Sequence, residues 1–119
     1  MKKILIIEDD EDMLELLKIV FRDSGHDVIY SRVVLSTDYI QILHPDLILL
    51  DVRLNGVSDS GAYLCKQLKT AGETKNLPVV LVSAEYNLAE IASECQADMY
   101  LKKPYELTTL MSQVNKYLS

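Results

Sequence analysis

Three stretches of the chain are continuously apolar and then stop at a polar side chain. They are residues 4–7 before Glu8, residues 47–50 before Asp51, and residues 79–82 before Ser83. Runs this short and this apolar are typical of strands buried on both faces of a parallel sheet. Together with their flanking residues, these runs predict strands over residues 3–7, 46–52 and 77–83, and the segments 27–31 and 99–102 predict two further strands.

Apolar residues recur at helical spacing between these strands. The predicted helices cover about residues 13–21, 36–43, 63–71, 87–95 and 107–118. At the first helix, Asp12 and Glu15 have the spacing of a capping box, and Gly25 is placed to end the helix. Five strands alternating with helices indicate an α/β fold with one parallel sheet.

The composition of the 119 residues, 49% apolar and 25% charged, predicts one globular domain. A net charge of −6 argues against a general nucleic-acid or membrane surface. No apolar run approaches the roughly 18 residues of a membrane span, and the short basic start is not typical of a signal peptide. Cys65 and Cys95 lack metal-type spacing, so we expect free thiols in a reducing cytosol.

The polar residues that end the strands predict a single site. In a parallel sheet the carboxyl ends of the strands meet at one edge, which brings together Glu8, Asp9, Asp51, Ser83 and Lys103. Carboxylates suit Mg²⁺, and a lysine with a metal ion is the usual pair for neutralising a transferring phosphoryl group. Because a carboxylate can also be the nucleophile, Asp51 is a candidate phosphoryl acceptor.

The sequence resembles the receiver domains of two-component response regulators over nearly its whole length. The resemblance is carried by Glu8-Asp9 after an aliphatic strand, Leu49-Leu50-Asp51, Ser83-Ala84, and Tyr100 followed by Lys103-Pro104. It implies a flavodoxin-like, doubly wound fold with five parallel strands in the order 2-1-3-4-5 and five helices. It also implies that residues 1–119 form a single receiver domain.

The resemblance implies a role for each residue at the acidic edge. Asp51 would accept phosphate from a histidine kinase phosphohistidine or a phosphotransfer protein. Glu8 and Asp9 would hold Mg²⁺, together with Asp51 and the backbone carbonyl of Arg53. Such a domain assists its own phosphorylation and autodephosphorylation in the cytoplasm, without being an enzyme in the usual sense.

A switch is also implied. Lys103 would contact the phosphate, Ser83 would turn inward to hydrogen-bond it, and Tyr100 would move in behind Ser83. The face made by the fourth helix, fifth strand and fifth helix would then be read by a partner or by a second copy of the chain. Side chains alternate along a strand, so only one of Lys102 and Lys103 can face the site, and the following Pro104 selects Lys103.

Arg53 and Glu85 each lie two residues beyond a predicted site residue, Asp51 and Ser83 respectively. In the receiver arrangement their opposite charges would pair across the mouth of the site. Such a pair would hinder a hydrolytic water and so lengthen the lifetime of the phosphoryl group.

The chain also departs from the family pattern. Leu54-Asn55 stands where Met-Pro is common, with about two extra residues before Gly61. Gln96 replaces the glycine usual before the fifth strand, at a cost of roughly 1 kcal/mol if the backbone there is left-handed.

Two rival functions remain open from the sequence. One is a metal-dependent phosphatase with an aspartyl nucleophile, which resembles an Asp-x-Asp pattern. Here Arg53 stands in place of the second Asp of that pattern, which counts against a phosphatase. The other is a structural pseudo-receiver that binds partners without phosphate. The presence of every expected side chain argues against it.

Overall fold

In the computed structural model, which describes residues 2–54 and 60–118, five strands form one parallel sheet in the order β2-β1-β3-β4-β5. The strands are β1 (Lys3–Ile7), β2 (Asp27–Ser31), β3 (Leu47–Asp51), β4 (Val79–Ser83) and β5 (Met99–Lys102). The three inner strands are buried on both faces apart from Lys3, which explains why their sequences are continuously apolar. This confirms the predicted fold class and strand order.

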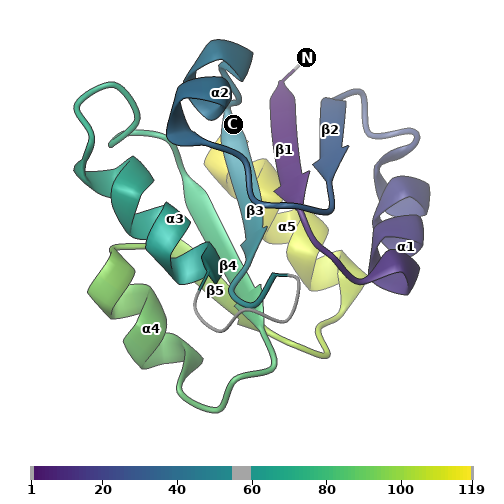
Figure 1. Ribbon diagram of the computed structural model, residues 1–119. Coiled ribbons are helices and arrows are strands. Elements are labelled where there is room, and N and C mark those ends of the chain that lie inside the picture. The colour runs from purple at the N-terminus through teal and green to yellow at the C-terminus, as the bar shows by residue number, and fades with distance from the viewer. Residues whose placement is uncertain (1, 55–59, 119) are drawn as a thin grey trace.

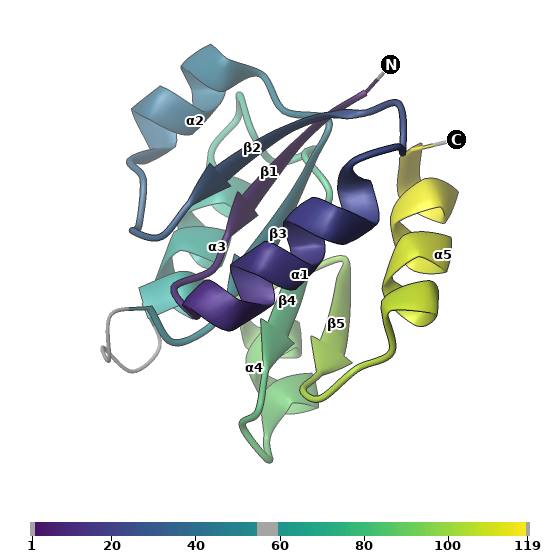
Figure 2. The ribbon, with the colours of Figure 1, turned by 90° about the vertical axis from the view of Figure 1, so that its right-hand side faces the viewer.

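Five helices cover the two faces of this sheet (Figures 1 and 2). They are α1 (Glu11–Phe21), α2 (Thr37–Leu43), α3 (Ser60–Thr70), α4 (Leu88–Cys95) and α5 (Leu107–Leu118). Two buried clusters separate the layers: one joins the sheet to α2, α3 and α4, and the other joins it to α1 and α5. None of the helices in the described ranges is both long and apolar enough to cross a membrane.

The start of α1 corrects one prediction. The N-cap is Asp10, whose carboxylate accepts hydrogen bonds from the backbone N–H groups of Asp12 and Met13. Asp12 is therefore inside the first turn and is not the cap. The helix also ends at Phe21, before Gly25, which has a φ of +83° in the turn that follows. Asp10 and Asp12 both lie at the N-terminus of α1, where the helix dipole favours negative charge.

One partly exposed residue, Asp98, connects four elements at the opposite end of the sheet from the strand-end acids. Asp98 Oδ2 accepts hydrogen bonds of 2.8 Å from both Val79 N–H and Lys69 Nζ. The Asp98 carbonyl oxygen accepts a third from the Tyr117 hydroxyl, at 2.9 Å. These bonds join α3, β4, the start of β5 and α5, and so hold these four elements together. The preceding turn contains Gln96 with a φ of 64°, the left-handed backbone that makes a side chain costly there.

Candidate acidic site at the carboxyl ends of the strands

The strand arrowheads point to one edge of the sheet, where the predicted acids meet (Figure 2). Glu8 follows β1 directly, and Asp51 ends the neighbouring β3. Ligand atoms of Glu8, Asp9 and Asp51 all lie within 4.8 Å of one another. Glu8 and Asp51 are only 2% and 5% exposed, so water screens their charges poorly. Such a group could hold a divalent cation.

Lys103 is the cation that the fold supplies to these acids. Its Nζ lies 2.7 Å from Glu8 Oε1 and donates a 3.2 Å hydrogen bond to Asp51 Oδ2. Burial alone would lower the pKa of Lys103, but the two carboxylates outweigh it and raise that pKa. Lys102 is exposed on the other face of the strand. The structure therefore agrees with the choice of Lys103 over Lys102.

The single Lys103 ammonium does not neutralise three carboxylates, and the charged form of the Glu8 carboxyl group is disfavoured. Burial, then the hydrogen bond and charge of Asp51, raise the pKa of Glu8 to about 7, although Lys103 opposes the shift. Glu8 Oε1 is buried and accepts no aligned hydrogen bond from the described residues, in spite of the nearby Lys103 ammonium. The nearest cation to this oxygen is the Lys103 ammonium, 2.7 Å away.

Asp51 is held by the loop that follows it and by the start of α3. Its Oδ1 accepts a 3.4 Å hydrogen bond from Arg53 N–H. Gly61 N–H donates to the Val52 carbonyl at 2.7 Å, and Ser60 Oγ accepts from Leu54 N–H at 3.0 Å. A Cβ added to Gly61 would overlap the carbonyl oxygen of Asp51. The residues 55–59, which include the Asn55 departure, lie outside the described part of the chain.

Ser83 and Tyr100 are near the site but do not contact Asp51 through any hydrogen bond of the described residues. Ser83 is 3% exposed, and its Oγ accepts a 3.0 Å hydrogen bond from Glu85 N–H. Tyr100 is 46% exposed on β5, paired in register with Leu81. The structure thus places Ser83 at the neighbouring strand end, with Tyr100 outward.

Arg53 and Glu85 do approach each other, with Arg53 Nε 4.0 Å from Glu85 Oε1. The Arg53 side chain is 58% exposed and that of Glu85 34%. The predicted pairing of opposite charges is therefore present, at the outer limit of an ion pair.

Tyr105 belongs to this site, although the sequence reasoning missed it. Its hydroxyl donates to Met13 Sδ at 3.6 Å, across from α1. Burial first, and the charge of Glu8 second, raise the pKa of Tyr105 to about 12. The signal in the sequence was its place directly after Pro104, two residues beyond Lys103.

Comparison with known proteins identifies the family of the chain. A family model described as the response regulator receiver domain matches residues 4–115. The chain is 29% identical over 120 residues to the DNA-binding response regulator MtrA of Mycolicibacterium paratuberculosis, covering 98% of this chain and 51% of that protein. It is 32% identical over 124 residues to the polar-differentiation response regulator DivK of Brucella ovis, covering 98% and 96%. The chain thus spans about half the length of MtrA and nearly all of DivK.

Solved structures show the same fold. A two-component response regulator from Clostridium difficile is 29% identical, with a TM-score of 0.80 over 99% of this chain and 96% of that one. The receiver domain of NtrX from Brucella abortus is 27% identical, with a TM-score of 0.80 over 97% of both chains. The chain belongs to the response regulator receiver domain family of two-component systems.

Proposed function

We propose that residues 1–119 act as one phosphoacceptor receiver domain, in which Asp51 accepts a phosphoryl group in an Mg²⁺-dependent step. The observation that carries the proposal is that buried Glu8 and Asp51 meet half-buried Asp9 at one edge of the sheet, with the Lys103 ammonium paired to Glu8 and Asp51. Receiver domains interact with histidine kinases and downstream effectors. A kinase phosphohistidine or a phosphotransfer protein is therefore the proposed donor, in the cytoplasm.

The residues present fit Mg²⁺. Glu8, Asp9 and Asp51 place ligand oxygens within 4.8 Å of one another, and carboxylate oxygens are the ligands that a hard cation prefers. Glu8, Asp9 and Asp51 would hold it, joined by the Arg53 backbone carbonyl. When bound, the ion would neutralise charge on the phosphoryl oxygens.

The chain's own groups would divide the remaining work. Asp51 Oδ1 or Oδ2 is the proposed nucleophile, positioned by Arg53 N–H and by Lys103 Nζ. On phosphorylation, the Lys103 ammonium would contact the new negative charge on the phosphoryl oxygens. Ser83 would exchange its bond to Glu85 N–H for one to the phosphoryl group. The domain would then assist its own phosphorylation and autodephosphorylation, without turning over a separate substrate.

The acceptor is tested by incubating the chain with acetyl phosphate and following its intact mass, with Mg²⁺ and with a chelator. We expect one phosphoryl group in Mg²⁺ alone, and none on Asp51→Asn. The matched control is Asp10→Asn, since asparagine caps a helix as well as aspartate does and should leave uptake intact. Uptake by Asp51→Asn would refute the acceptor assignment. Turnover of an added phosphate ester would instead favour the phosphatase.

The two adjacent lysines provide a second control in the same assay. Lys103→Ala should keep most of the Mg²⁺ affinity but respond poorly to beryllofluoride, because the lost charge faces the phosphoryl oxygens. Lys102→Ala should behave as wild type. The same loss in both variants would mean that the lysine acts through general charge alone. Wild type that binds neither Mg²⁺ nor beryllofluoride would favour the pseudo-receiver.

We further propose that Arg53 and Glu85 slow hydrolysis of the phosphoryl group by narrowing the approach for water. Their 4.0 Å separation spans the gap between the residues after β3 and those after β4. Arg53→Ala and Glu85→Ala should each shorten the phosphoryl lifetime, measured as decay after donor removal. Equal decay rates in wild type and both variants would remove this role.

A further inference from the structure

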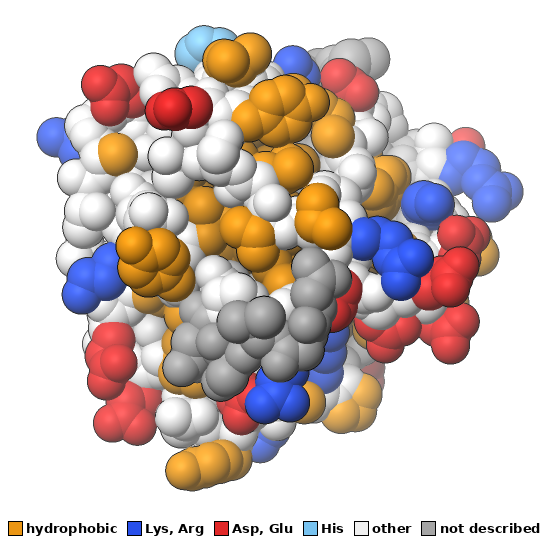
Figure 3. Space-filling model, viewed as in Figure 1, with side chains coloured by type: hydrophobic (Ala, Val, Ile, Leu, Met, Phe, Trp, Pro, Cys, Tyr) orange, Lys and Arg blue, Asp and Glu red, His pale blue; other side chains and the backbone are white. Residues whose placement is uncertain are grey.

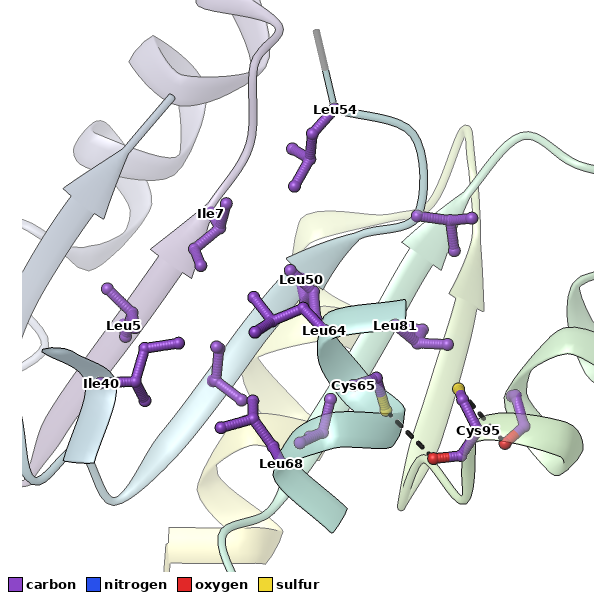
Figure 4. Close-up of a cluster of buried hydrophobic side chains, with 14 of the residues drawn as sticks. Leu5, Ile7, Ile40, Leu50, Leu54, Leu64, Cys65, Leu68, Leu81 and Cys95 are labelled. Atoms are coloured by element: carbon purple, nitrogen blue, oxygen red, sulfur yellow. Dashed lines mark hydrogen bonds between the residues drawn. The ribbon is translucent and has the colours of Figure 1, made fainter. Parts of the chain in front are cut away.

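The two cysteines of the chain face each other across the contact between α3 and α4. Cys65 lies in the middle of α3, and Cys95 is the last residue of α4, 30 positions later. Both side chains belong to the buried cluster on that face of the sheet, where Figure 4 shows them side by side. Nothing in the phosphoacceptor site uses either thiol.

The Cys65 thiol already reaches the other cysteine. It donates a 3.5 Å hydrogen bond to the Cys95 carbonyl oxygen, and the Cys95 thiol donates to the Ala92 carbonyl at 3.7 Å (Figure 4). The nearby Cys65 thiol lowers the pKa of Cys95 to about 7, while the neighbouring Cys95 and burial raise the pKa of Cys65. Cys95 is therefore the thiol that ionises first.

A small oxidant can approach Cys95 from outside. An open groove with a volume of ≈ 550 Å³ runs between α3 and α4, on the side of the molecule that Figure 3 faces. Its lining includes Tyr63 and Lys66 from α3, and Ile91, Glu94 and Cys95 from α4. Cys65 does not contribute to the lining and is fully buried behind it. Cys95, which is 3% exposed, thus borders the groove, and Cys65 packs against it without exposure.

We propose that Cys65 and Cys95 form an oxidation site, at which a peroxide produces an intramolecular disulfide between α3 and α4. The Cys95 thiolate attacks one oxygen of hydrogen peroxide, the O–O bond breaks, and the leaving hydroxide takes up a proton to become water. The Cys65 sulfur then attacks the Cys95 sulfenic acid, and its hydroxyl leaves with the Cys65 proton as a second water. The thiols lose two electrons, and one peroxide becomes two waters.

The disulfide would attach the end of α4 covalently to α3. The sequence from Cys95 leads directly through Gln96 into the turn before β5. A bond at this point restrains α4 where it enters the turn. Oxidation therefore acts on the same helix that the proposed switch must move, from its opposite end.

The experiment treats the reduced chain with hydrogen peroxide and measures intact mass, followed by peptide mapping without reductant. Wild type should lose about 2 Da, the mass of two hydrogen atoms, and yield a linked Cys65–Cys95 peptide pair that dithiothreitol separates. Cys65→Ala should instead give a dimedone adduct at Cys95, because the sulfenic acid has no resolving thiol. Cys95→Ala should stay unmodified, because Cys65 is fully buried. Oxidised wild type should also show slower hydrogen exchange in α4.

Three results would overturn the proposal. It is overturned if treated wild type keeps two free thiols, or if the disulfide links two chains instead of two helices. A dimedone adduct at Cys65 in Cys95→Ala would likewise overturn it, by showing that the buried thiol is the one attacked. Wild type needs no substitution for the mass and mapping readouts, so misfolding of a variant cannot decide the result.

Discussion

Burial of the Glu8 carboxyl group disfavours its charged form. Its raised pKa of about 7, against an ordinary 4.5, means that the folded protein binds this proton more tightly than the unfolded chain does. The group therefore stabilises the fold below pH 4.5, and this contribution is lost as the pH rises through about 7. In the metal-free protein, the Glu8 carboxyl group should therefore lower the free energy of unfolding progressively as the pH rises from 4.5 to about 7.

This decrease in unfolding free energy is measured by urea unfolding of wild type and Glu8→Gln between pH 4.5 and about 7, with a chelator present. Glutamine keeps the shape of the side chain but cannot titrate, so the difference between the two proteins isolates the carboxyl group. We expect the wild type to lose stability relative to Glu8→Gln as the pH increases from 4.5 to 7. A difference that does not vary with pH would contradict the raised pKa of the buried Glu8 carboxyl group.

Residue-level predictions from the sequence were right where a pattern fixes the direction of a side chain. Alternation along β5 and the following proline were enough to separate Lys103 from Lys102, and the apolar runs were enough to locate Glu8 and Asp51. They failed where the outcome depends on packing. Asp10 and Asp12 are both good caps, and only the turn after β1 decides between them. The contact between Cys65 and Cys95 is invisible until two helices are placed together.

At the scale of elements, α3 begins against the strand that carries the acceptor. Gly61 has no room for a side chain, since a Cβ would overlap Asp51 O and lie 2.9 Å from Val52 Cα. The sequence showed a glycine at this point and the need for a turn. It could not show that a backbone carbonyl occupies the missing side chain's place. The absence of a methyl group here sets the distance between α3 and β3.

This contact predicts opposite results for two glycines. Gly61→Ala must push α3 away from Asp51, so we expect a loss of roughly 1–3 kcal/mol in unfolding free energy and reduced phosphoryl uptake. Gly72 is the matched control, because nothing lies within 4 Å of its added Cβ and its φ is not positive. Gly72→Ala should leave stability unchanged or raise it by up to about 1 kcal/mol. Urea unfolding and acetyl phosphate uptake measure both, and equal behaviour would discount the contact.

The boundaries of elements were predicted less well than their order. The expected third strand began at Asp46 and the fourth at Leu77, whereas β3 and β4 begin at Leu47 and Val79. Proline explains the second difference, since Pro78 has no N–H for the ladder. The last helix and β5 were predicted with the observed limits, because their patterns are bounded by turns on both sides.

At the scale of the whole molecule, the proposed switch must carry a change at Asp51 to the surface of α4, β5 and α5. The path starts at Ser83, which can reach a phosphoryl group only by releasing Glu85 N–H at the entrance to α4. A ligand shifts such an equilibrium only through its differential affinity for the two states, and this exchanged bond is one source of that difference.

Hydrogen exchange over residues 84–118, with and without beryllofluoride and Mg²⁺, tests this path. Wild type and Ser93→Ala should respond, since Ser93 is exposed on α4 and outside the path. Ser83→Ala should respond much less while still binding the mimic. A full response from Ser83→Ala, or none from wild type, would show that the signal travels by another route.

The origin of Lys103 in the sequence has a consequence for the order of folding. Glu8, Asp9 and Asp51 come from adjacent strands early in the chain, whereas their ammonium partner follows Asp51 by 52 residues, after the edge strand β5. A chain that has paired β1 with β3 but has not yet docked β5 therefore holds three carboxylates together without Lys103. Docking of the last strand relieves that repulsion. The charges gathered at this edge thus couple the docking of β5 to the pairing of β1 with β3.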